Sequence, residues 1–308
     1  MATALISHEA CLNHVTPDGH AERVGRLKAV MAALEPLELV RREAPMAAED
    51  DLLRVHPQAH IDAIRAAAPE TGLVALDADT FMSPGSLEAA WRAAGAVVKA
   101  VDMVLSGEVA NAFCAVRPPG HHAEKETPMG FCLFGSVAAG AKHALDHHGL
   151  SRVAIVDFDV HHGNGTQDLV EEDARIFFTS THQMPLYPGT GFAHETGAHN
   201  NVLNMPLAEG TGGAAFRKVM EQQVFPRIEA FKPDLLMISA GFDAHRDDPL
   251  AGLTFEVEDF RWATERLCDL AQTLCKGRVV SSLEGGYDLE ALAASAAAHV
   301  EVLKERGE

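Results

Sequence analysis

Six short apolar runs, separated by longer amphipathic stretches, constrain the fold of this chain more than any other feature of its sequence. Continuous apolar runs of this length, without strict alternation, are typical of a parallel sheet that is covered on both faces. Each run is therefore predicted to be a β-strand. The predicted strands are 3–7, 112–116, 153–158, 175–180, 235–240 and 278–283.

The stretches between these runs have the periodicity of helices. After Ser86, a predicted N-cap, apolar residues recur at i, i+3 and i+4, and the last helix is predicted to follow the capping residue Asp288 and to end at Gly307. Alternation of strands and helices along residues 1–308 predicts a single α/β domain with a mainly parallel central sheet. The predicted helices are 86–105, 132–148, 213–230, 256–275 and 288–305.

The composition is that of a globular protein with a sizeable core, because 47% of the 308 residues are hydrophobic and 22% are charged. With 44 acidic and 25 basic residues, the net charge is −19. Nucleic acids and anionic membranes are bound by clustered Lys and Arg, so neither is expected as a partner. The acidic balance is compatible with a cationic substrate, although solubility alone also accounts for it.

The chain shows no features of a secreted or membrane-spanning protein. The first residues lack a basic segment followed by a long apolar run, and no apolar stretch reaches the ~18 residues that a membrane helix needs. The five cysteines are odd in number, scattered and free of CxxC spacing. They are interpreted as buried thiols in a reducing compartment, so a cytoplasmic location is expected.

Polar or glycine-rich segments follow five of the predicted strands directly. In open α/β sheets, ligands bind beyond the carboxyl ends of the strands, so these segments are expected to meet at one edge of the sheet. The predicted functional site lies at that edge. The five segments read RPPGHHA, DVHHGNG, THQ, GFDAH and EGGYDL.

Asp159, His161 and Asp243 are the candidate metal ligands. Strand residues two apart point to the same side, so Asp159 and His161 can bind one cation together, and Asp243 ends another strand. Three protein ligands with an open fourth position are typical of a catalytic zinc site. The alternative is that the first two side chains only cap the helix that follows.

Asp157 precedes these residues and is predicted to orient a histidine, as carboxylates beside metal sites commonly do. The tandem pair His121–His122 is the expected partner, because it follows a rigid Pro-Pro-Gly turn at another strand end. A second tandem pair, His147–His148, lies inside a helical pattern and is interpreted as a surface feature.

Tyr287 follows two glycines at a further strand end, where its phenol can donate a hydrogen bond to a developing oxyanion. The alternative is an ordinary half-buried tyrosine. No Ser or Cys nucleophile with its own base is evident, and no phosphate-binding glycine loop is found. A metal, a histidine pair and a phenol together favour hydrolysis of an amide or ester by metal-activated water.

These residues resemble those of the histone deacetylase family, the zinc-dependent deacetylases of arginase-like fold. The resemblance implies that Asp159, His161 and Asp243 bind one Zn²⁺. It also implies a structural K⁺ held by Asp157 near Ser180. The motifs that carry the resemblance are HAERVGRL, RPPGHHA, GFCLF, DFDVHHGNGTQ, STH, YPGTG, SAGFDAH and LEGGY.

The resemblance assigns roles to the remaining polar residues of the site. His122 is the implied proton-shuttling base and acid, and His121 is its electrostatic companion. Asn164 orients His122, and an amide there, where some relatives have Asp, predicts a less basic imidazole. Tyr287 would polarise the acetyl carbonyl. Asn164 and the EGGY motif favour the class II-like, bacterial branch.

The resemblance also implies a narrow substrate channel. Phe131 and Tyr187 would form its walls, the Gly130 carbonyl would accept the amide proton of the substrate, and Arg23 would be a buried arginine near the floor. The implied substrate is acetyl-lysine in a protein or peptide. An acetylated polyamine is the alternative, and it is disfavoured because Leu250 stands where the eukaryotic polyamine-specific branch has Glu.

Two other functions fit the residues less well. An arginase-like ureohydrolase with two Mn²⁺ ions needs bridging carboxylates, but the later site reads Asp243-Ala244-His245. A catalytically inactive module that binds acylated ligands would not need the histidine pair and Tyr287, which are present. The sequence leaves the oligomeric state open, a homo-oligomer included.

Overall fold

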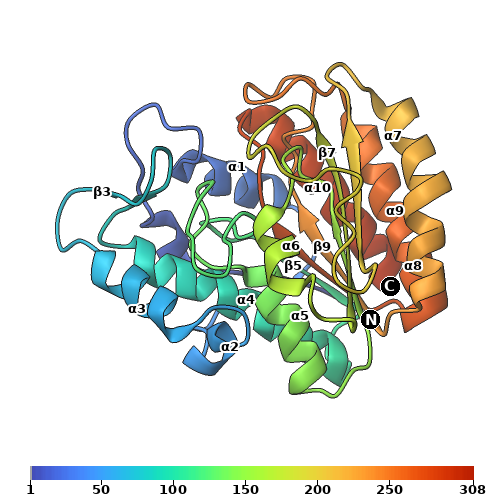
Figure 1. Ribbon diagram of the computed structural model, residues 1–308, viewed down its shortest axis with the longest axis horizontal. Coiled ribbons are helices and arrows are strands. Elements are labelled where there is room, and N and C mark those ends of the chain that lie inside the picture. Colours follow the sequence, from blue (N-terminus) through green and yellow to red (C-terminus); the bar gives the residue numbers. More distant parts are fainter. Residues whose placement is uncertain (1) are drawn as a thin grey trace.

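A sheet of eight parallel strands forms the centre of the structure, a computed structural model that describes residues 2–308 (Figure 1). Its strand order is β2-β1-β5-β10-β9-β6-β7-β8, and a small antiparallel pair, β3-β4, lies apart from it. All six predicted strands are confirmed. The strands are β1 Thr3–Ser7, β2 Val40–Glu43, β3 Val74–Ala75, β4 Phe81–Met82, β5 Asn111–Cys114, β6 Val153–Asp157, β7 Ile176–Gln183, β8 Val202–Leu207, β9 Leu235–Ala240 and β10 Val279–Leu283.

The two outer strands of the large sheet, β2 and β8, were not predicted. Strand β2 reads VRRE and is mostly exposed, and β8 contains Asn204 and Pro206. An edge strand has one unpaired side and tolerates polar residues and proline, so it lacks the continuous apolar run of a central strand.

Helices cover both faces of the sheet, as predicted (Figure 1). Helices α4 and α5 pack together on one face, whereas α1, α9 and α10 pack on the other. The helices are α1 Val24–Leu34, α2 Glu49–Leu53, α3 Gln58–Ala67, α4 Ser86–Ser106, α5 Ser136–Asp146, α6 Asn164–Val170, α7 Gly213–Val219, α8 Phe225–Phe231, α9 Val257–Cys275 and α10 Leu289–Gly307, with a 3₁₀ turn at Glu9–Leu12 and a π turn at Met220–Val224.

Two helix predictions need correction. The predicted helix 213–230 is divided by the π turn into α7 and α8. The predicted N-cap Ser86 is instead the first residue of α4; its hydroxyl accepts a hydrogen bond from the backbone of Ser83 and lies 2.6 Å from His14 Nδ1. Its oxygen is therefore used by the preceding loop. The predicted cap Asp288 is confirmed, since its carboxylate accepts two backbone hydrogen bonds at the start of α10.

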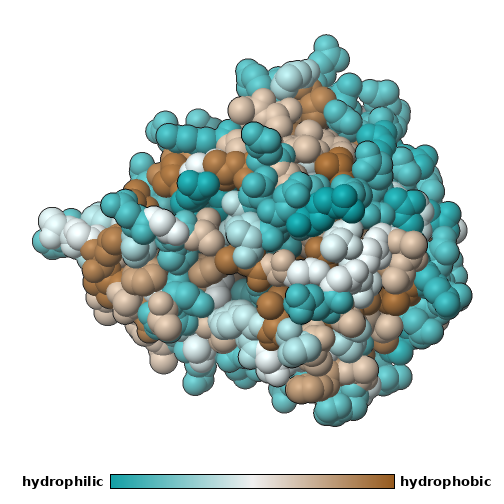
Figure 2. Space-filling view, turned by 90° about the horizontal axis from the view of Figure 1, so that it is seen from above, coloured by the Kyte–Doolittle hydropathy of each residue, from teal (hydrophilic) through white to brown (hydrophobic). Residues whose placement is uncertain are grey.

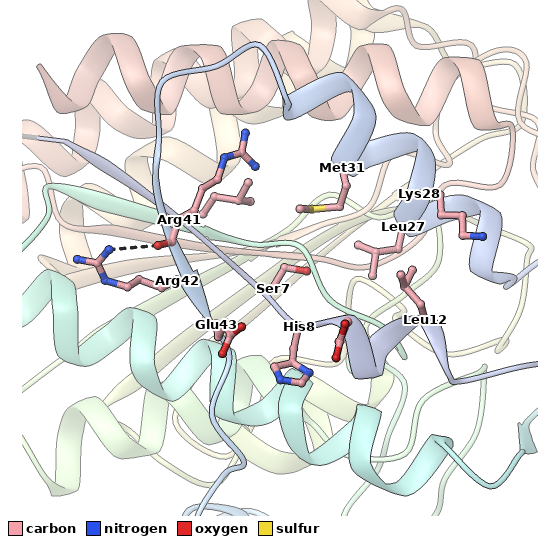
Figure 3. Close-up of a pocket in the computed structure, with 11 residues that line it drawn as sticks. Ser7, His8, Leu12, Leu27, Lys28, Met31, Arg41, Arg42 and Glu43 are labelled. Carbon is pink, nitrogen blue, oxygen red and sulfur yellow. Dashed lines mark hydrogen bonds between the residues drawn. The ribbon is translucent and has the colours of Figure 1, made fainter.

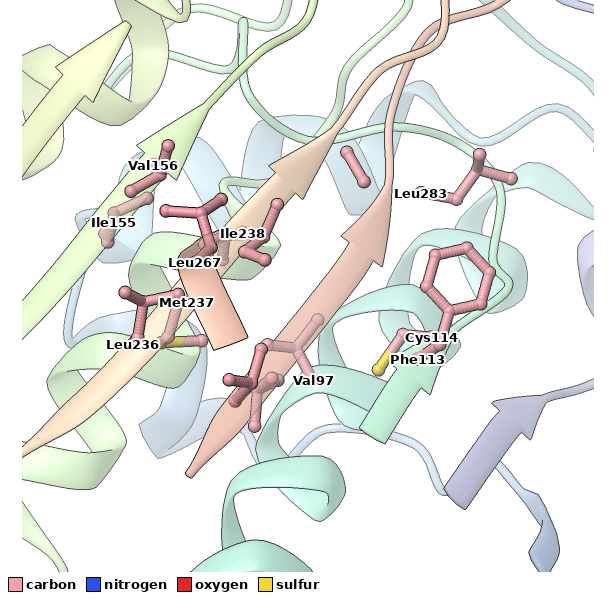
Figure 4. Close-up of a cluster of buried hydrophobic side chains, with 14 of the residues drawn as sticks. Val97, Phe113, Cys114, Ile155, Val156, Leu236, Met237, Ile238, Leu267 and Leu283 are labelled. Atoms are coloured by element: carbon pink, nitrogen blue, oxygen red, sulfur yellow. The ribbon is translucent and has the colours of Figure 1, made fainter. Parts of the chain in front are cut away.

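The core lies between the central strands and the helices on either side. Figure 4 shows Ile155, Leu236 and Ile238 on neighbouring strands, with Val97 of α4 and Leu267 of α9 close to the same sheet. All five side chains are fully buried. The five cysteines are also buried and free, as predicted. This packed base holds the strand ends in fixed positions.

No helix within residues 2–308 combines the length and the apolar character needed to cross a membrane.

Candidate functional site

Five strands that are neighbours in the sheet, β5, β10, β9, β6 and β7, bring the predicted residues together at their carboxyl ends. The parallel arrangement puts these five ends on the same edge, as predicted (Figure 1). The loops that follow the strands carry the histidine pair, Tyr287 and the three candidate metal ligands. The site is therefore assembled from segments that lie far apart in the chain.

The candidate ligands Asp159, His161 and Asp243 form one compact group. One ligand atom from each lies within 4.8 Å of the others, and all three residues are buried. His161 Nδ1 lies 3.1 Å from both Asp159 Oδ1 and Asp243 Oδ2. This set of two carboxylate oxygens and one imidazole nitrogen is of the kind that Zn²⁺ accepts.

The electrostatics of this group also favour a cation. Burial alone would lower the pKa of His161, but the Asp159 and Asp243 carboxylates raise it to about 10. Two buried carboxylates that face one imidazole thus stabilise positive charge between them. Backbone N–H groups of Gly285 and Val160 hold the two carboxylates at 2.8 Å, so the group is already ordered. The residues present fit a bound divalent metal.

Two glycines leave the space in which the carboxylates lie. A Cβ at Gly241 would stand 2.1 Å from Asp159 Oδ2, and a Cβ at Gly285 would stand 2.2 Å from Asp243 Oδ2. No side chain fits at either position without displacing a candidate ligand. This explains the glycines in the motifs SAGFDAH and LEGGY.

His121 is held by the carboxylate predicted for it. Its Nδ1 lies 3.0 Å from Asp157 Oδ2, and its Nε2 lies 3.7 Å from Asp159 Oδ2. Burial opposes charge on the ring, but the Asp159 and Asp157 carboxylates raise the pKa of His121 well above its ordinary value. His121 is therefore a buried imidazolium next to the candidate metal group.

His122 is in the opposite state. Its Nδ1 lies 2.7 Å from Asn164 Oδ1, while the amide nitrogen of Asn164 donates to Glu124 and so fixes the orientation of the amide. His122 Nδ1–H is thus the donor, and Nε2 keeps a free lone pair. Burial, together with the charges of His121 and His161, lowers the pKa of His122 well below its ordinary value.

Two of the predicted channel residues, Phe131 and Tyr187, make ring contacts with residues of the site. The Tyr187 ring lies 5.2 Å from the His122 ring, and the Phe131 ring lies 5.8 Å from the Tyr287 ring. Tyr187 is 38% exposed and Leu250 is 37% exposed. Tyr287 is buried, which raises the pKa of its phenol well above the ordinary value and keeps it a hydrogen-bond donor.

Gly130 lies directly against the histidine pair. A Cβ at this position would stand 2.4 Å from the His122 ring, and its φ of 54° lies in the left-handed region. Its carbonyl accepts a hydrogen bond from the Cys132 thiol at 3.3 Å. Only glycine allows this close approach of the backbone to the imidazole.

The prediction that Arg23 is the buried arginine is wrong. Arg23 is exposed and has an extended backbone as the N-cap of α1. Three residues further on, Arg26 is fully buried; its guanidinium donates to the carbonyl of Gly286 at 2.6 Å and lies 4.9 Å from the Tyr287 ring centre. Arg23 precedes α1, whereas Arg26 lies on the buried face of that helix.

Glu284 was not predicted to have a role, although it belongs to the LEGGY motif. Its buried carboxylate accepts hydrogen bonds from the backbone N–H groups of Gly120 and His121, at 2.7 and 3.2 Å. It therefore holds the turn that carries the histidine pair. The sequence signal for this role was a glutamate directly after an apolar strand, within the LEGGY motif. Only the fold shows which backbone groups its carboxylate meets.

A buried ion-pair network supports the same turn from the other side. Arg117, of the RPPG segment, donates to Glu22 at 2.6 Å, and Glu22 also pairs with Arg26 at 3.1 Å. All three residues are fully buried. Burial opposes the negative charge of Glu22, but Arg117 and His14 lower its pKa well below the ordinary value.

Asp157 and Ser180, the residues predicted to hold K⁺, are partners in the register of β6 and β7. The Ser180 hydroxyl lies 2.9 Å from His182 Nδ1, and Asp157 Oδ1 accepts the backbone N–H of Asp159. Both side chains are buried. The potassium site stays a prediction.

The surface around the strand ends is mixed in character. Figure 2, seen from above the view of Figure 1, shows hydrophobic residues in separate patches among hydrophilic ones. A cavity of about 540 Å³ lies elsewhere, beside the carboxyl ends of β1 and β2 (Figure 3). Leu12, Leu27 and Met31 line its apolar part, and none of the predicted site residues lines it.

Comparisons with known proteins identify similar chains. A family model described as the histone deacetylase domain matches residues 20–303. Histone deacetylase 10 of Oryza sativa is 41% identical, with 91% of this chain and 68% of the relative covered. The histone deacetylase-like amidohydrolase of Pseudomonas aeruginosa is 38% identical over 87% of this chain and 73% of its own. The crystal structure of the HDA15 HD domain has a TM-score of 0.93 and 34% identity, with 99% of this chain and 89% of that chain covered.

Proposed function

Because the chain belongs to the histone deacetylase family and is a hydrolase of amide bonds, we propose that it is a zinc-dependent deacetylase of acetyl-lysine or a similar acylated amine. Residues 1–308 act as one catalytic domain in this proposal. Acetyl-lysine in a protein or peptide is the proposed substrate. The proposal rests on one observation, a three-ligand group beside two histidines of which one pairs with a carboxylate and the other with an amide.

Asp159, His161 and Asp243 would hold the zinc ion. A bound Zn²⁺ supplies Lewis acidity, which polarises the substrate carbonyl and makes a water molecule more acidic. The ordered carboxylates and the glycines beside them support this assignment, since the group needs no rearrangement to receive the ion.

His122 is the proposed general base, because its Nε2 lone pair is free while Asn164 holds Nδ1. It takes a proton from the attacking water and returns one to the leaving amine. His121, charged and fixed by Asp157, stabilises the negative charge that develops beside it. The Tyr287 phenol donates a hydrogen bond to the carbonyl oxygen as it becomes an oxyanion.

Phe131 and Tyr187 are the proposed walls of a channel for the alkyl chain of the substrate. The Gly130 carbonyl is the proposed acceptor for the substrate amide proton, and Leu250, which is exposed, is the proposed rim residue. A K⁺ ion on Asp157 and Ser180 would stabilise the strand ends beneath the site.

The test combines metal removal with substitutions. Chelation is expected to abolish deacetylation of an acetyl-lysine peptide, and added Zn²⁺ to restore it. Asp243→Ala is expected to lose zinc and activity together, whereas Tyr287→Phe keeps its zinc and loses most of the activity. Full activity after chelation, in protein shown to be free of metal, would refute the mechanism.

An acetylated polyamine is the second candidate substrate, since the net charge of −19 suits either cationic substrate. Rates for acetyl-lysine peptides, acetylated polyamines and longer acyl-lysines separate the two. A kcat/KM that is highest for the polyamine would replace the proposed substrate and leave the reaction class intact.

A further inference from the structure

A second group of metal-ligating side chains lies at the C-terminal end of α5. His143, His147 and His148 each offer a ring nitrogen, and these atoms lie within 4.8 Å of one another. Helix α5 runs against the strands, so this end lies at the bottom of Figure 1, away from the carboxyl ends of the strands. The group is thus separate from the site described above.

The helix itself brings the first two imidazoles together. His143 and His147 are four residues apart, and their rings stack with centroids 4.7 Å apart and an angle of 13° between the planes. His148 follows directly, with its ring 5.3 Å from that of His143. The exposed pair that the sequence placed on the surface therefore converges with a buried third histidine.

A carboxylate from a different helix completes the group. Asp102 Oδ1, from α4, lies 2.7 Å from His143 Nε2 and 2.7 Å from His148 Nε2. The Asp102 side chain is 48% exposed, so a hydrated ion can reach it from solvent. The group then offers three imidazole nitrogens and one carboxylate oxygen.

The buried histidine has carboxylates at both of its nitrogens. His143 Nδ1 lies 3.3 Å from Asp51 Oδ1 but has no hydrogen-bond partner, while Nε2 faces Asp102. A neutral imidazole has one N–H and cannot donate to both carboxylates. A metal ion bound to Nε2 would let Nδ1–H donate to Asp51, so that no lone pair of the ring would face a carboxylate. Arg54, the neighbouring cation, pairs with Asp51 and Asp146 instead.

We propose that His143, His147, His148 and Asp102 form a second site for a divalent transition metal, with Zn²⁺ the natural probe. Three imidazoles and one carboxylate suit a four-coordinate zinc ion. The exposed side chain of His147 and the partly buried side chain of His148 would adjust to bond lengths of about 2.0–2.1 Å. The ion would link α4 to α5, so it stabilises the fold and takes no part in deacetylation.

The test is the number of zinc ions bound per chain after dialysis against micromolar free Zn²⁺. Wild type is expected to bind two and the double variant His147→Gln/His148→Gln one. The matched control His194→Gln/His199→Gln, two exposed histidines elsewhere, is expected to keep two. Asp243→Asn also is expected to bind one, which separates this site from the proposed catalytic one.

Thermal unfolding gives an independent readout. In the Asp243→Asn background, added Zn²⁺ is expected to raise the Tm, and the rise is lost when His147→Gln/His148→Gln is added. Two zinc ions in the double variant, or none in Asp243→Asn, would overturn the second site. A single zinc that is lost with His147→Gln/His148→Gln and kept in Asp243→Asn would support it and refute the proposed catalytic metal group.

Discussion

Glu284 positions the tandem histidines through the backbone. Its carboxylate accepts two backbone hydrogen bonds from the turn at Gly120 and His121, and its own carbonyl accepts one from Arg26. Glu284 therefore joins the loop after β10 to the loop after β5. A buried carboxylate with such partners fixes geometry that a packed apolar residue would leave free.

Glu284→Ala is expected to lower kcat about ten- to a hundred-fold, because the backbone N–H groups of Gly120 and His121, which both donate to one carboxylate oxygen, lose their acceptor and the histidine turn shifts. Zinc content and KM are expected to change little, since the Glu284 carboxylate bonds to the backbone of the histidine turn and not to a proposed metal ligand or channel wall. Steady-state kinetics with a zinc assay on the same sample checks both. An unchanged kcat would show that Glu284 has no positioning role.

Leu250→Glu tests substrate choice at the rim of the proposed channel. Leu250 is 37% exposed, so a carboxylate there stays charged and attracts a second amine on the substrate. A pair of charges about 4 Å apart in water gains about 1 kcal/mol, so the preference for an acetylated diamine over an acetyl-lysine peptide is expected to rise about fivefold. Leu250→Gln is the uncharged control, and an equal shift in both variants would exclude a charge effect.

At the level of elements, the strand ends depend on tight loops that contain glycine. Gly241 follows β9 and Gly285 follows β10, and each faces a carboxylate of the candidate metal group. The two loops also contact each other, since the backbone N–H of Phe242 donates to the carbonyl of Gly285. The backbone of both loops thus lies directly against the carboxylates of the candidate metal group.

Gly285→Ala is expected to abolish zinc binding at the candidate metal group, because its Cβ would stand 2.2 Å from Asp243 Oδ2 and 2.4 Å from Asp159 Oδ2. Far-ultraviolet circular dichroism is expected to show the helices intact. Gly25→Ala, in α1, is the matched control, since its nearest contact would be an ordinary 3.5 Å. Wild-type zinc affinity in Gly285→Ala would contradict the steric argument.

At the level of the whole molecule, His299 joins helix α10 to the sheet and to α9. Its Nδ1 lies 2.7 Å from the Thr264 hydroxyl, and its Nε2 lies 2.8 Å from the Ser281 hydroxyl. The Phe113 and Phe242 rings pack around it. Burial lowers the pKa of His299 to about 3, so the ring is neutral in the folded protein.

This histidine makes the folded state sensitive to acid. In the unfolded chain a histidine titrates near pH 6.5, whereas the folded pKa of His299 is about 3. Below pH 6.5 only the unfolded state binds the proton, so the free energy of unfolding falls by about 1.4 kcal/mol per pH unit down to about pH 3. Its full contribution is present above pH 6.5.

Urea unfolding at pH 6.5 and 5.5 checks this expectation. His299→Gln is expected to lose about 1 kcal/mol less than wild type over that interval, because it has no ring to protonate. His194→Gln is expected to follow wild type, since solvent already surrounds His194. The same loss in wild type and His299→Gln would show that other groups govern the acid sensitivity.

Much of the fold could be predicted because the central strands are continuous apolar runs in the sequence. β1 and β9 have the predicted bounds, since a strand buried on both faces must be apolar throughout. The edge strands β2 and β8 were not predicted, because an edge strand need not be apolar throughout. The site residues were predicted from the same strands, because polar side chains directly after buried parallel strands gather at the carboxyl edge of the sheet.

The sequence by itself determined the parallel α/β fold, the edge of the sheet that carries the site and the residue types gathered there, because local periodicity and strand-end position are properties of neighbouring residues. Tertiary structure alone decided that Arg26 and not Arg23 is buried, which backbone groups Glu284 holds, and that His143 and His148 meet Asp102. Those contacts join residues distant in the chain, and their distances are set by how helices and loops pack against the sheet.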